Sequence, residues 1–398
     1  MQATFKNLTA PEIAAPTGNI DSLKMALKFG ADAVYLGLDR FNARMKADNF
    51  TLENLPQWLS YAHDRGAKVY VALNTLIKQR ELIAATNVAL NALSLGADAV
   101  ILQDIGLLKK IKEKNPAAVI HASTQMGVHN LEGALLLKDM GATRIILSRE
   151  VPFNDIAEIK AKSGLEVEVF VQGALCVAFS GNCYFSSAVS GYSGNRGMCM
   201  QLCRKKYTAL IERGNGAEKE INSGYLLSPA DLCLLTEIKK LTDIGVDSFK
   251  IEGRMRRPEY VGEAVRIYKN AVHGKFAEND IDCLKSIYNR GDYTAGYLYK
   301  THGKNFIDTR LPGHKGLLCG SVVSAGRGFI VANIARPVST CDAFKILRDG
   351  REVGNAVAET DQNKGECRLK ATGNIKAGDK IFITTDMKQI ARLNQNGG

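Results

Sequence analysis

Short apolar segments recur along the first 250 residues, each preceded by a glycine and one or two small or polar residues. This repeat is found at 30–37, 66–74, 96–103, 141–148 and 245–252. The glycine is typical of a helix C-terminus, where the backbone turns left-handed. The runs rich in Val, Ile and Leu that follow are typical of parallel strands covered by helices. The pattern therefore predicts strands that alternate with helices.

Three further apolar segments, at 12–16, 119–123 and 166–172, complete a set of eight predicted strands. Amphipathic segments between strands predict helices, for example at 22–29, 52–65, 131–140 and 229–244. Eight alternating units predict an α/β protein whose parallel strands close into a TIM-like (β/α)₈ barrel. A doubly wound open sheet is the alternative, which the even spacing disfavours.

The pattern changes after residue 274. A polar segment without the barrel repeat is followed by short predicted strands at 317–324, 328–332, 342–346, 366–371 and 379–384. Such strands, separated by turn residues, predict a small antiparallel β-barrel. We expect a (β/α)₈ barrel over 1–278, a connecting segment over 279–315 and a small C-terminal β-barrel domain over 316–398.

Polar residues occupy one face of several predicted strands. Glu168 and Gln172 alternate with valines, and Lys250 and Glu252 alternate with Phe249 and Ile251. Helices must cover the apolar face, so the polar face points into the barrel. The same alternation places inside the barrel Glu12, Tyr35, Asn74, Gln103, His121 and Gln125. Barrel interiors are usually filled by branched apolar residues, so these residues predict a site for a polar, anionic small molecule.

Two sets of site residues follow from this interior and from the residues just past the strand ends, where barrel enzymes place their chemistry. The expected catalytic residues are Glu168, Gln172, Lys250, Glu252 and Arg254. The expected substrate-binding residues are Asn74, Gln103, His121, Gln125, Arg149, Glu150 and Arg204. Glu168 and Lys250 lie on adjacent strands and are expected to pair, because buried charges are costly alone. A structural ion pair is the simpler interpretation of these two residues, but pairing does not exclude binding.

The cysteines cluster in one part of the chain. None of the nine precedes Cys176, and five fall between Cys176 and Cys233. Four of them, Cys176, Cys183, Cys199 and Cys203, lie in a long insertion after strand seven, residues 173–228. Four thiolates suit zinc or an iron–sulfur cluster; the absence of a C-x₂-C pair favours the cluster. Cys233, at the start of a predicted helix, is a fifth candidate or a core residue.

The cysteine region resembles a known family. The stretch 168–187, EVFVQGALCVAFSGNCYFSS, is similar to the motif of peptidase family U32, the collagenase-like proteases. Further blocks resemble the family at 32–37 (DAVYLG), 121–126 (HASTQM), 195–204 (NRGMCMQLCR) and 248–254 (SFKIEGR). Together they cover about residues 10–275, with a looser match in the C-terminal barrel.

The resemblance implies a function that the family name does not. Bacterial members similar to this chain are oxygen-independent hydroxylation factors for a 23S rRNA cytidine, for a tRNA wobble uridine or in ubiquinone synthesis. The HASTQM and RGMCMQLCR stretches favour the ribosomal RNA group over the quinone group. By resemblance, Cys176, Cys183, Cys199 and Cys203 would hold a 4Fe–4S cluster. Prephenate would be the co-substrate that supplies oxygen.

Charge and composition bear on partners and location. The net charge of +11 favours a polyanion such as RNA, and a generally basic enzyme without such a partner is the alternative. Besides RNA, we expect a small anionic co-substrate and an iron–sulfur electron donor as partners. No apolar run is long enough for a signal peptide or a membrane span, so we expect a cytoplasmic protein without membrane contact.

Two other function classes stay open. A peptidase needs a nucleophile and base or a metal site, yet the sequence contains neither H-E-x-x-H nor G-x-S-x-G, and no histidine lies between His129 and His273. A non-catalytic RNA-binding or assembly protein would use the basic residues 204–206 and 254–257. The polar barrel interior argues against binding alone.

Overall fold

A computed structural model describes residues 10–45, 47–212, 218–299 and 306–395 of the chain. The chain divides into two compact units, and each is described by itself. The first comprises Met1–Leu202, Leu232–Phe276 and Ala295–His302; the second comprises Cys203–Asp231, Ala277–Thr294 and Gly303–Gly398. None of the described helices is both long enough and apolar enough to span a bilayer.

Eight parallel strands form the centre of the first unit. They are β1 (Glu12–Thr17), β2 (Ala33–Gly37), β3 (Lys68–Leu73), β4 (Ala99–Leu102), β5 (Ile120–Ala122), β6 (Arg144–Ile146), β7 (Glu166–Ala174) and β11 (Ser248–Ile251). Each strand pairs with the next, and β11 pairs with both β7 and β1. The sheet is therefore a closed barrel, which confirms the predicted fold and excludes the open sheet.

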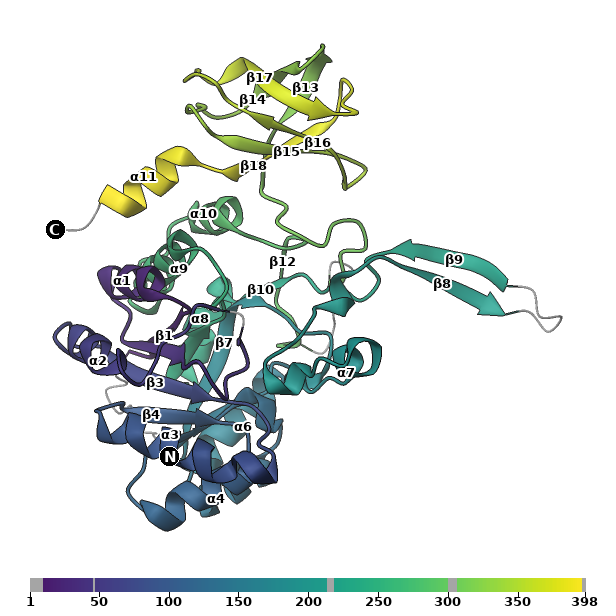
Figure 1. Ribbon diagram of the computed structural model, residues 1–398. Coiled ribbons are helices and arrows are strands. Elements are labelled where there is room, and N and C mark those ends of the chain that lie inside the picture. Colours follow the sequence, from purple (N-terminus) through teal and green to yellow (C-terminus); the bar gives the residue numbers. More distant parts are fainter. Residues whose placement is uncertain (1–9, 46, 213–217, 300–305, 396–398) are drawn as a thin grey trace, which may run out of the picture. The chain divides into compact units, whose positions relative to one another are not determined.

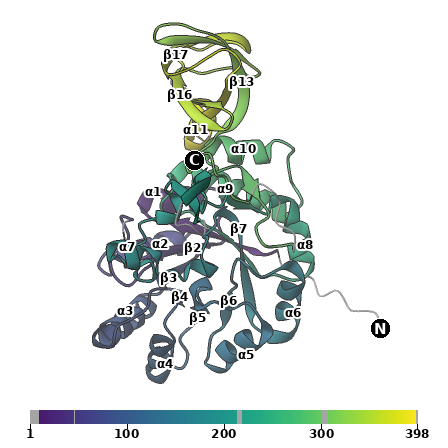
Figure 2. The same cartoon turned by 90° about the vertical axis from the view of Figure 1, so that its right-hand side faces the viewer.

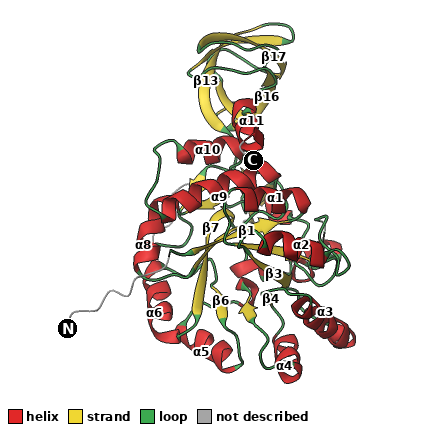
Figure 3. Cartoon of the chain, turned by 90° about the vertical axis from the view of Figure 1, so that its left-hand side faces the viewer, coloured by secondary structure: helices red, strands yellow, loops and turns green. Residues whose placement is uncertain are grey.

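Helices surround these strands (Figure 3). They are α1 (Ile20–Lys28), α2 (Leu55–His63), α3 (Leu82–Ser94), α4 (Ile105–Lys114), α5 (Leu131–Asp139), α6 (Phe153–Ser163), α8 (Ile238–Asp243) and α9 (Pro258–Val272). Side-chain caps fix several helix starts: Asn19, Asp104 and Asn130 each accept a backbone N–H of the first turn. The glycines that precede the five repeated segments all have positive φ, from 73° to 110°, as helix ends require.

The predicted helix over 229–244 is wrong in its first half. Residues Asp231–Cys233 form strand β10, which lies next to β7 in the sheet, and Leu234 N donates to Val171 O at 2.8 Å. A short 3₁₀ turn (Leu235–Glu237) then leads into α8. The long strand β7 extends to Ala174 and offers backbone groups to this segment, and pairing with them outweighs the helical periodicity.

The second unit contains a closed antiparallel barrel, as predicted. Its strands are β13 (Leu317–Ala325), β14 (Phe329–Ile334), β15 (Ala343–Arg348), β16 (Arg351–Val357), β17 (Gly365–Gly373) and β18 (Lys380–Thr385). The sequence prediction missed β16, because REVGNAV has few apolar residues. Cys319 and Cys367 lie in the core of this barrel.

The other elements of the second unit are short. They are the hairpin β8 (Tyr207–Glu212) and β9 (Glu218–Gly224), strand β12 (Tyr293–Thr294), and helices α10 (Asp280–Ile287) and α11 (Met387–Gln395). Figure 1 labels these elements along the chain. Gln389 of α11 accepts from Ser286 Oγ at 2.7 Å and donates to Cys283 O at 2.9 Å, so α11 packs against α10.

Candidate functional site

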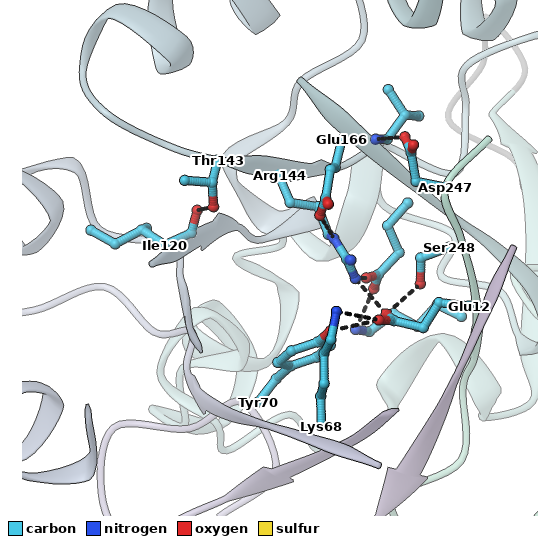
Figure 4. A network of polar contacts seen from close by, with 12 residues as sticks. Glu12, Lys68, Tyr70, Ile120, Thr143, Arg144, Glu166, Asp247 and Ser248 are labelled. Atoms are coloured by element: carbon cyan, nitrogen blue, oxygen red, sulfur yellow. Dashed lines mark hydrogen bonds and ion pairs between the residues drawn. The ribbon is translucent and has the colours of Figure 1, made fainter. Parts of the chain in front are cut away.

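An ionic network crosses the interior of the (β/α)₈ barrel at the amino ends of its strands (Figure 4). Arg144 Nη1 lies 2.6 Å from Glu12 Oε1 and 3.0 Å from Glu168 Oε2, and its Nε lies 2.8 Å from Glu166 Oε2. Tyr70 OH donates to Glu12 Oε2 at 2.7 Å. These polar groups satisfy one another, and barrel enzymes place their chemistry at the opposite end. The network therefore fills the amino end of the barrel and has a structural role.

The predicted pair of Glu168 and Lys250 is confirmed. Lys250 Nζ lies 2.5 Å from Glu168 Oε1, and both residues are buried. Burial alone would raise the pKa of Glu168, but Lys250 and Arg144 lower it to about 2. Burial lowers the pKa of Lys250, which also stands 3.9 Å from the centre of the Tyr35 ring. The carboxylate is thus held ionised between two cations.

Three buried polar atoms of the barrel have no hydrogen-bond partner within the described part of the chain. They are Gln103 Oε1, His121 Nδ1 and Ser148 Oγ. Their residues lie on or just after three consecutive strands, β4 to β6. Gln172, which was predicted to face the barrel interior, instead accepts from Tyr268 OH of helix α9 at 3.0 Å, because a register shift between β7 and β11 turns its side chain toward the helices. A buried unsatisfied polar atom costs roughly 1–3 kcal/mol, and such atoms commonly face a water or a ligand. This arc fits a polar small molecule.

Three arginines act on one carboxylate at the carboxyl end of the barrel: Arg44 and Arg149 pair with Glu252, and Arg254 adds its charge. Arg44 Nη2 lies 3.0 Å from Glu252 Oε1, and Arg149 Nη2 lies 3.5 Å from Glu252 Oε2. Burial would raise the pKa of Glu252, but Arg44, Arg149 and Arg254 lower it to about 2. Burial and the charge of Arg44 lower the pKa of Arg254 to about 10. The site therefore carries more positive than negative charge.

Backbone geometry holds the arginines in place. Asn42 Oδ1 accepts from Arg44 N at 2.7 Å and from Arg254 Nη1 at 3.4 Å, and Asn42 Nδ2 donates to Leu38 O. A Cβ on Gly37 would lie 2.7 Å from Arg254 Nη1 and 2.8 Å from Asn42 Cγ, so a larger residue would displace these two side chains. The sequence prediction missed Asn42, Arg44 and Ser148. Asn42 and Arg44 follow strand β2 in a loop at the catalytic end, and this position was the available signal.

Some of the residues predicted to bind substrate contact one another, whereas others form hydrogen bonds with loop residues. Asn74 Nδ2 donates to Gln125 Oε1 at 2.7 Å. Glu150 instead accepts from Ser180 N at 2.9 Å and from Ser180 Oγ at 2.6 Å. Arg204, in the second unit, donates to Ser228 Oγ at 2.8 Å and to the Pro229 carbonyl. These contacts give Glu150 and Arg204 a role in holding loops, and substrate binding by either residue stays a prediction.

The insertion of residues 173–228, called the cysteine loop below, is fixed in its first part to the barrel loops around this site. It contains two 3₁₀ turns (Phe179–Gly181 and Gly194–Arg196) and helix α7 (Phe185–Ser190). Arg196 forms a two-point ion pair with Glu81, at 2.8 and 2.9 Å. A Cβ on Gly197 would lie 2.3 Å from Asn42 O, so the loop backbone lies directly against the arginine site.

Three cysteine sulfurs of the first unit accept backbone N–H groups from two residues ahead. Cys183 Sγ accepts from Phe185 N at 3.3 Å, Cys199 Sγ from Gln201 N at 3.4 Å, and Cys176 from Ala178. Burial raises the pKa of Cys176, the charge of Arg149 lowers it, and Cys183 and Cys199 raise it. The three thiols therefore lie within electrostatic range of one another and of the arginine site.

The assignment of Cys176, Cys183, Cys199 and Cys203 as cluster ligands stays a prediction. Among the residues it describes, no three His, Cys, Asp or Glu side chains are placed to hold a metal ion. Cys203 is the first residue of the second unit. Cys233, on β10, has its sulfur 3.7 Å from Tyr268 OH.

A closed (β/α)₈ barrel with charged interior residues and a cysteine-bearing loop at its carboxyl end defines the class of this protein. The sequence model described as peptidase family U32 matches residues 18–308. The chain belongs to this family, which confirms the resemblance seen in its motifs.

Three relatives illustrate the range of names in the family. An "uncharacterized protease" of Methanocaldococcus jannaschii is 37% identical over 94% of this chain and 98% of its own length. A "23S rRNA 5-hydroxycytidine C2501 synthase" of Escherichia coli is 32% identical over 89% of this chain and 55% of its own. The "tRNA hydroxylation protein P1" of Bacillus subtilis is 35% identical over 67% of this chain and 64% of its own. The chain thus spans about half of the rRNA enzyme and under two thirds of the tRNA protein.

Proposed function

We propose that this protein is an iron–sulfur-dependent, oxygen-independent hydroxylase of a base in RNA. A cytidine of 23S rRNA is the first candidate target, and a tRNA uridine is the second. The observation that carries the proposal is the combined charge of Arg44, Arg149 and Arg254 acting on the single carboxylate of Glu252, beside the cysteine loop. Relatives named for rRNA and tRNA hydroxylation support RNA as the substrate.

The surplus positive charge supports an anionic co-substrate. Three guanidinium groups against one carboxylate leave two positive charges without a counter-charge, which a dicarboxylate such as prephenate would neutralise. Arginine binds carboxylates through two parallel N–H groups. The unpaired atoms of Gln103, His121 and Ser148 would receive the polar, uncharged part of the same molecule.

The cysteines would hold a 4Fe–4S cluster through Cys176, Cys183, Cys199 and Cys203. Four thiolates on one zinc ion must each come within about 2.3 Å of it, whereas each thiolate of a cluster binds a different iron atom. Cys183 and Cys199 both act electrostatically on Cys176 within the first unit, which supports these three as ligands of one group. Bound there, the cluster would supply electron transfer, and the N–H···S contacts of the loop would tune its potential.

The side chains of the barrel have distinct tasks in this proposal. The arginines bind and orient the anion. Glu168 stays ionised and pairs with Lys250, and Lys250, whose pKa is lowered by burial, is the member of the pair that could donate a proton to the ligand. His121 stays neutral, because burial and then Arg144 lower its pKa. Its Nδ1 is therefore available as a hydrogen-bonding group rather than as a cation.

Iron content tests the cluster. Anaerobically purified protein is expected to contain iron and sulfide, and Cys176→Ser or Cys199→Ser should lower both strongly. Cys341→Ser is the matched control, because Cys341 is exposed and lies in the small barrel. Iron-free wild-type protein prepared without oxygen would contradict the proposed cofactor.

Nucleoside mass spectrometry tests the reaction. RNA from a deletion strain should lack a hydroxylated pyrimidine that the wild-type gene restores and the Cys176→Ser gene does not. Unchanged rRNA and tRNA nucleosides would refute RNA hydroxylation.

Peptide hydrolysis is the second candidate, because one of the relatives that match over nearly their full length carries a protease name. Release of peptides by iron-free protein, retained in Cys176→Ser, would favour it over the proposed reaction.

A further inference from the structure

Exposed aromatic side chains gather in the cysteine loop. Tyr184 is 74% exposed, Tyr192 49% and Phe179 46%. Only two other aromatic residues in the described part of the chain are comparably exposed, Phe276 and Tyr299. An aromatic ring in water forgoes a large burial free energy. Three such rings within fourteen residues of one loop indicate a surface that is covered by something else.

The loop backbone presents these rings rigidly. Tyr184 directly follows Cys183 and precedes α7, and its carbonyl accepts from Ala188 N at 2.8 Å. Tyr192 follows Gly191, which ends the helix with a φ of 72°. A six-residue helix spans roughly 9 Å, so the two tyrosines stand at its opposite ends. Helix α7 lies at the outside of the first unit in both Figure 1 and Figure 2.

The charge of the loop selects among possible partners. Residues 173–202 contain no Asp or Glu, although the whole chain has 41 in 398 residues, and Arg196 is their single charged residue. The hairpin β8–β9 also exposes apolar side chains, Leu210 and Ile221, but its strands carry three glutamates, Glu212, Glu218 and Glu220, against one lysine, Lys219. A polyanion would therefore meet a net negative charge on these strands and no carboxylate on residues 173–202.

We propose that unpaired RNA bases stack on Tyr184 and Tyr192 beside the cysteines. The inference rests on the proposed function for the identity of the partner as RNA. Proteins that recognise single-stranded RNA stack splayed bases on tyrosine and phenylalanine. The stacking rings position the nucleotide next to the cysteine loop, and the basic chain attracts its phosphates. Tyr184 and Tyr192 act as positioning residues, because they hold the RNA without touching the reacting atoms.

The test measures RNA binding by fluorescence anisotropy with anaerobic full-length protein. The probe is a fluorescent single-stranded RNA dodecamer of mixed sequence, compared with the same strand in a duplex. Tyr184→Leu and Tyr192→Leu should each weaken single-strand binding roughly 5- to 150-fold, the range that follows from the loss of one stacked base. Tyr184→Phe should keep wild-type affinity, because it retains the ring. Phe276→Leu is the matched control and should bind like the wild type.

Leucine separates stacking from apolar protein docking, because leucine keeps the apolar surface and removes the ring face. Wild-type affinity in both leucine variants would overturn the inference, and so would equal binding of strand and duplex or no binding of either. The iron content of each variant must match that of the wild type. If Tyr184→Leu loses iron, Tyr192→Leu still tests stacking, because Tyr192 is not adjacent to a cysteine in the chain.

The outcomes also separate this inference from the proposed reaction. If the leucine variants bind normally while the hydroxylated nucleoside forms in cells, stacking is refuted and hydroxylation stands. If ring-dependent binding is found without any hydroxylated nucleoside, the stacking surface stands and the reaction is refuted.

Discussion

Substitution of Glu252 by glutamine tests whether the arginine site carries surplus charge. Glu252 is 14% exposed as a side chain and faces Arg44, Arg149 and Arg254. Its pKa falls from 4.5 to about 2 in the folded protein. A difference of about 2.5 pKa units corresponds to roughly 3 kcal/mol of stability. Glu252→Gln should therefore lower the barrel's melting temperature by about 6–12 °C, at 2–4 °C per kcal/mol.

The pH dependence has a definite sign. Because the folded pKa of Glu252 is depressed, its stabilising effect is complete above its ordinary pKa of 4.5. The effect is lost as the pH falls through the folded pKa of about 2. The difference in unfolding free energy between wild type and Glu252→Gln should be constant from pH 8 to 5 and shrink below pH 4.5. Chemical denaturation at several pH values measures it.

An added dianion should rescue the variant. The wild-type site holds three cations and one anion, a surplus of two, and Glu252→Gln raises it to three. Malonate should therefore raise the melting temperature of the variant more than that of the wild type. Glu166→Gln is the control: Glu166 is half exposed, pairs with Arg144, and should cost at most about 1 kcal/mol. An unchanged stability of Glu252→Gln, or equal malonate shifts, would refute the surplus-charge argument.

Two further substitutions test the buried Glu168–Lys250 pair and the contact of the cysteine loop with Asn42. Lys250→Met leaves the buried Glu168 with one cation fewer and should cost about 3–5 kcal/mol in urea denaturation; the double variant with Glu168→Gln should cost less than the sum of the single variants, and strict additivity would show that the pair is not coupled. Gly197→Ala should loosen the cysteine loop, since its Cβ would lie 2.3 Å from Asn42 O; Gly191→Ala is matched, with φ also positive but nothing within 4 Å. Faster proteolysis of the loop in Gly197→Ala alone is expected, and equal proteolysis of both would count against docking on Asn42.

The barrel could be predicted because its local signals agree with its tertiary structure. Each glycine before a strand is a real helix end, and Glu168 of β7 and Lys250 of β11 do face inward, as their contact shows. Gln172 of β7 does not, because a register shift between β7 and β11 turns its side chain toward Tyr268 of α9. The prediction of one helix over 229–244 was wrong, because part of this segment pairs with the backbone of β7, and helical periodicity does not reveal such pairing. The prediction missed strand β16, because closure of the small barrel requires a strand there even though its sequence is largely polar.

The sequence by itself determined the order of strands and helices, the inward polar faces, the grouping of four cysteines after the seventh strand and the family. These features are written in local spacing, since alternation and helical periodicity depend only on neighbouring residues. Tertiary structure decided which charges meet. Arg44 follows β2 and Glu252 follows β11, 208 residues apart, and they come within 3.0 Å because barrel closure brings β11 beside β1 and β1 beside β2. A local sequence pattern cannot predict a contact between residues so far apart in the chain. The excess of arginine over carboxylate at the carboxyl end of the barrel was therefore found only in the tertiary structure.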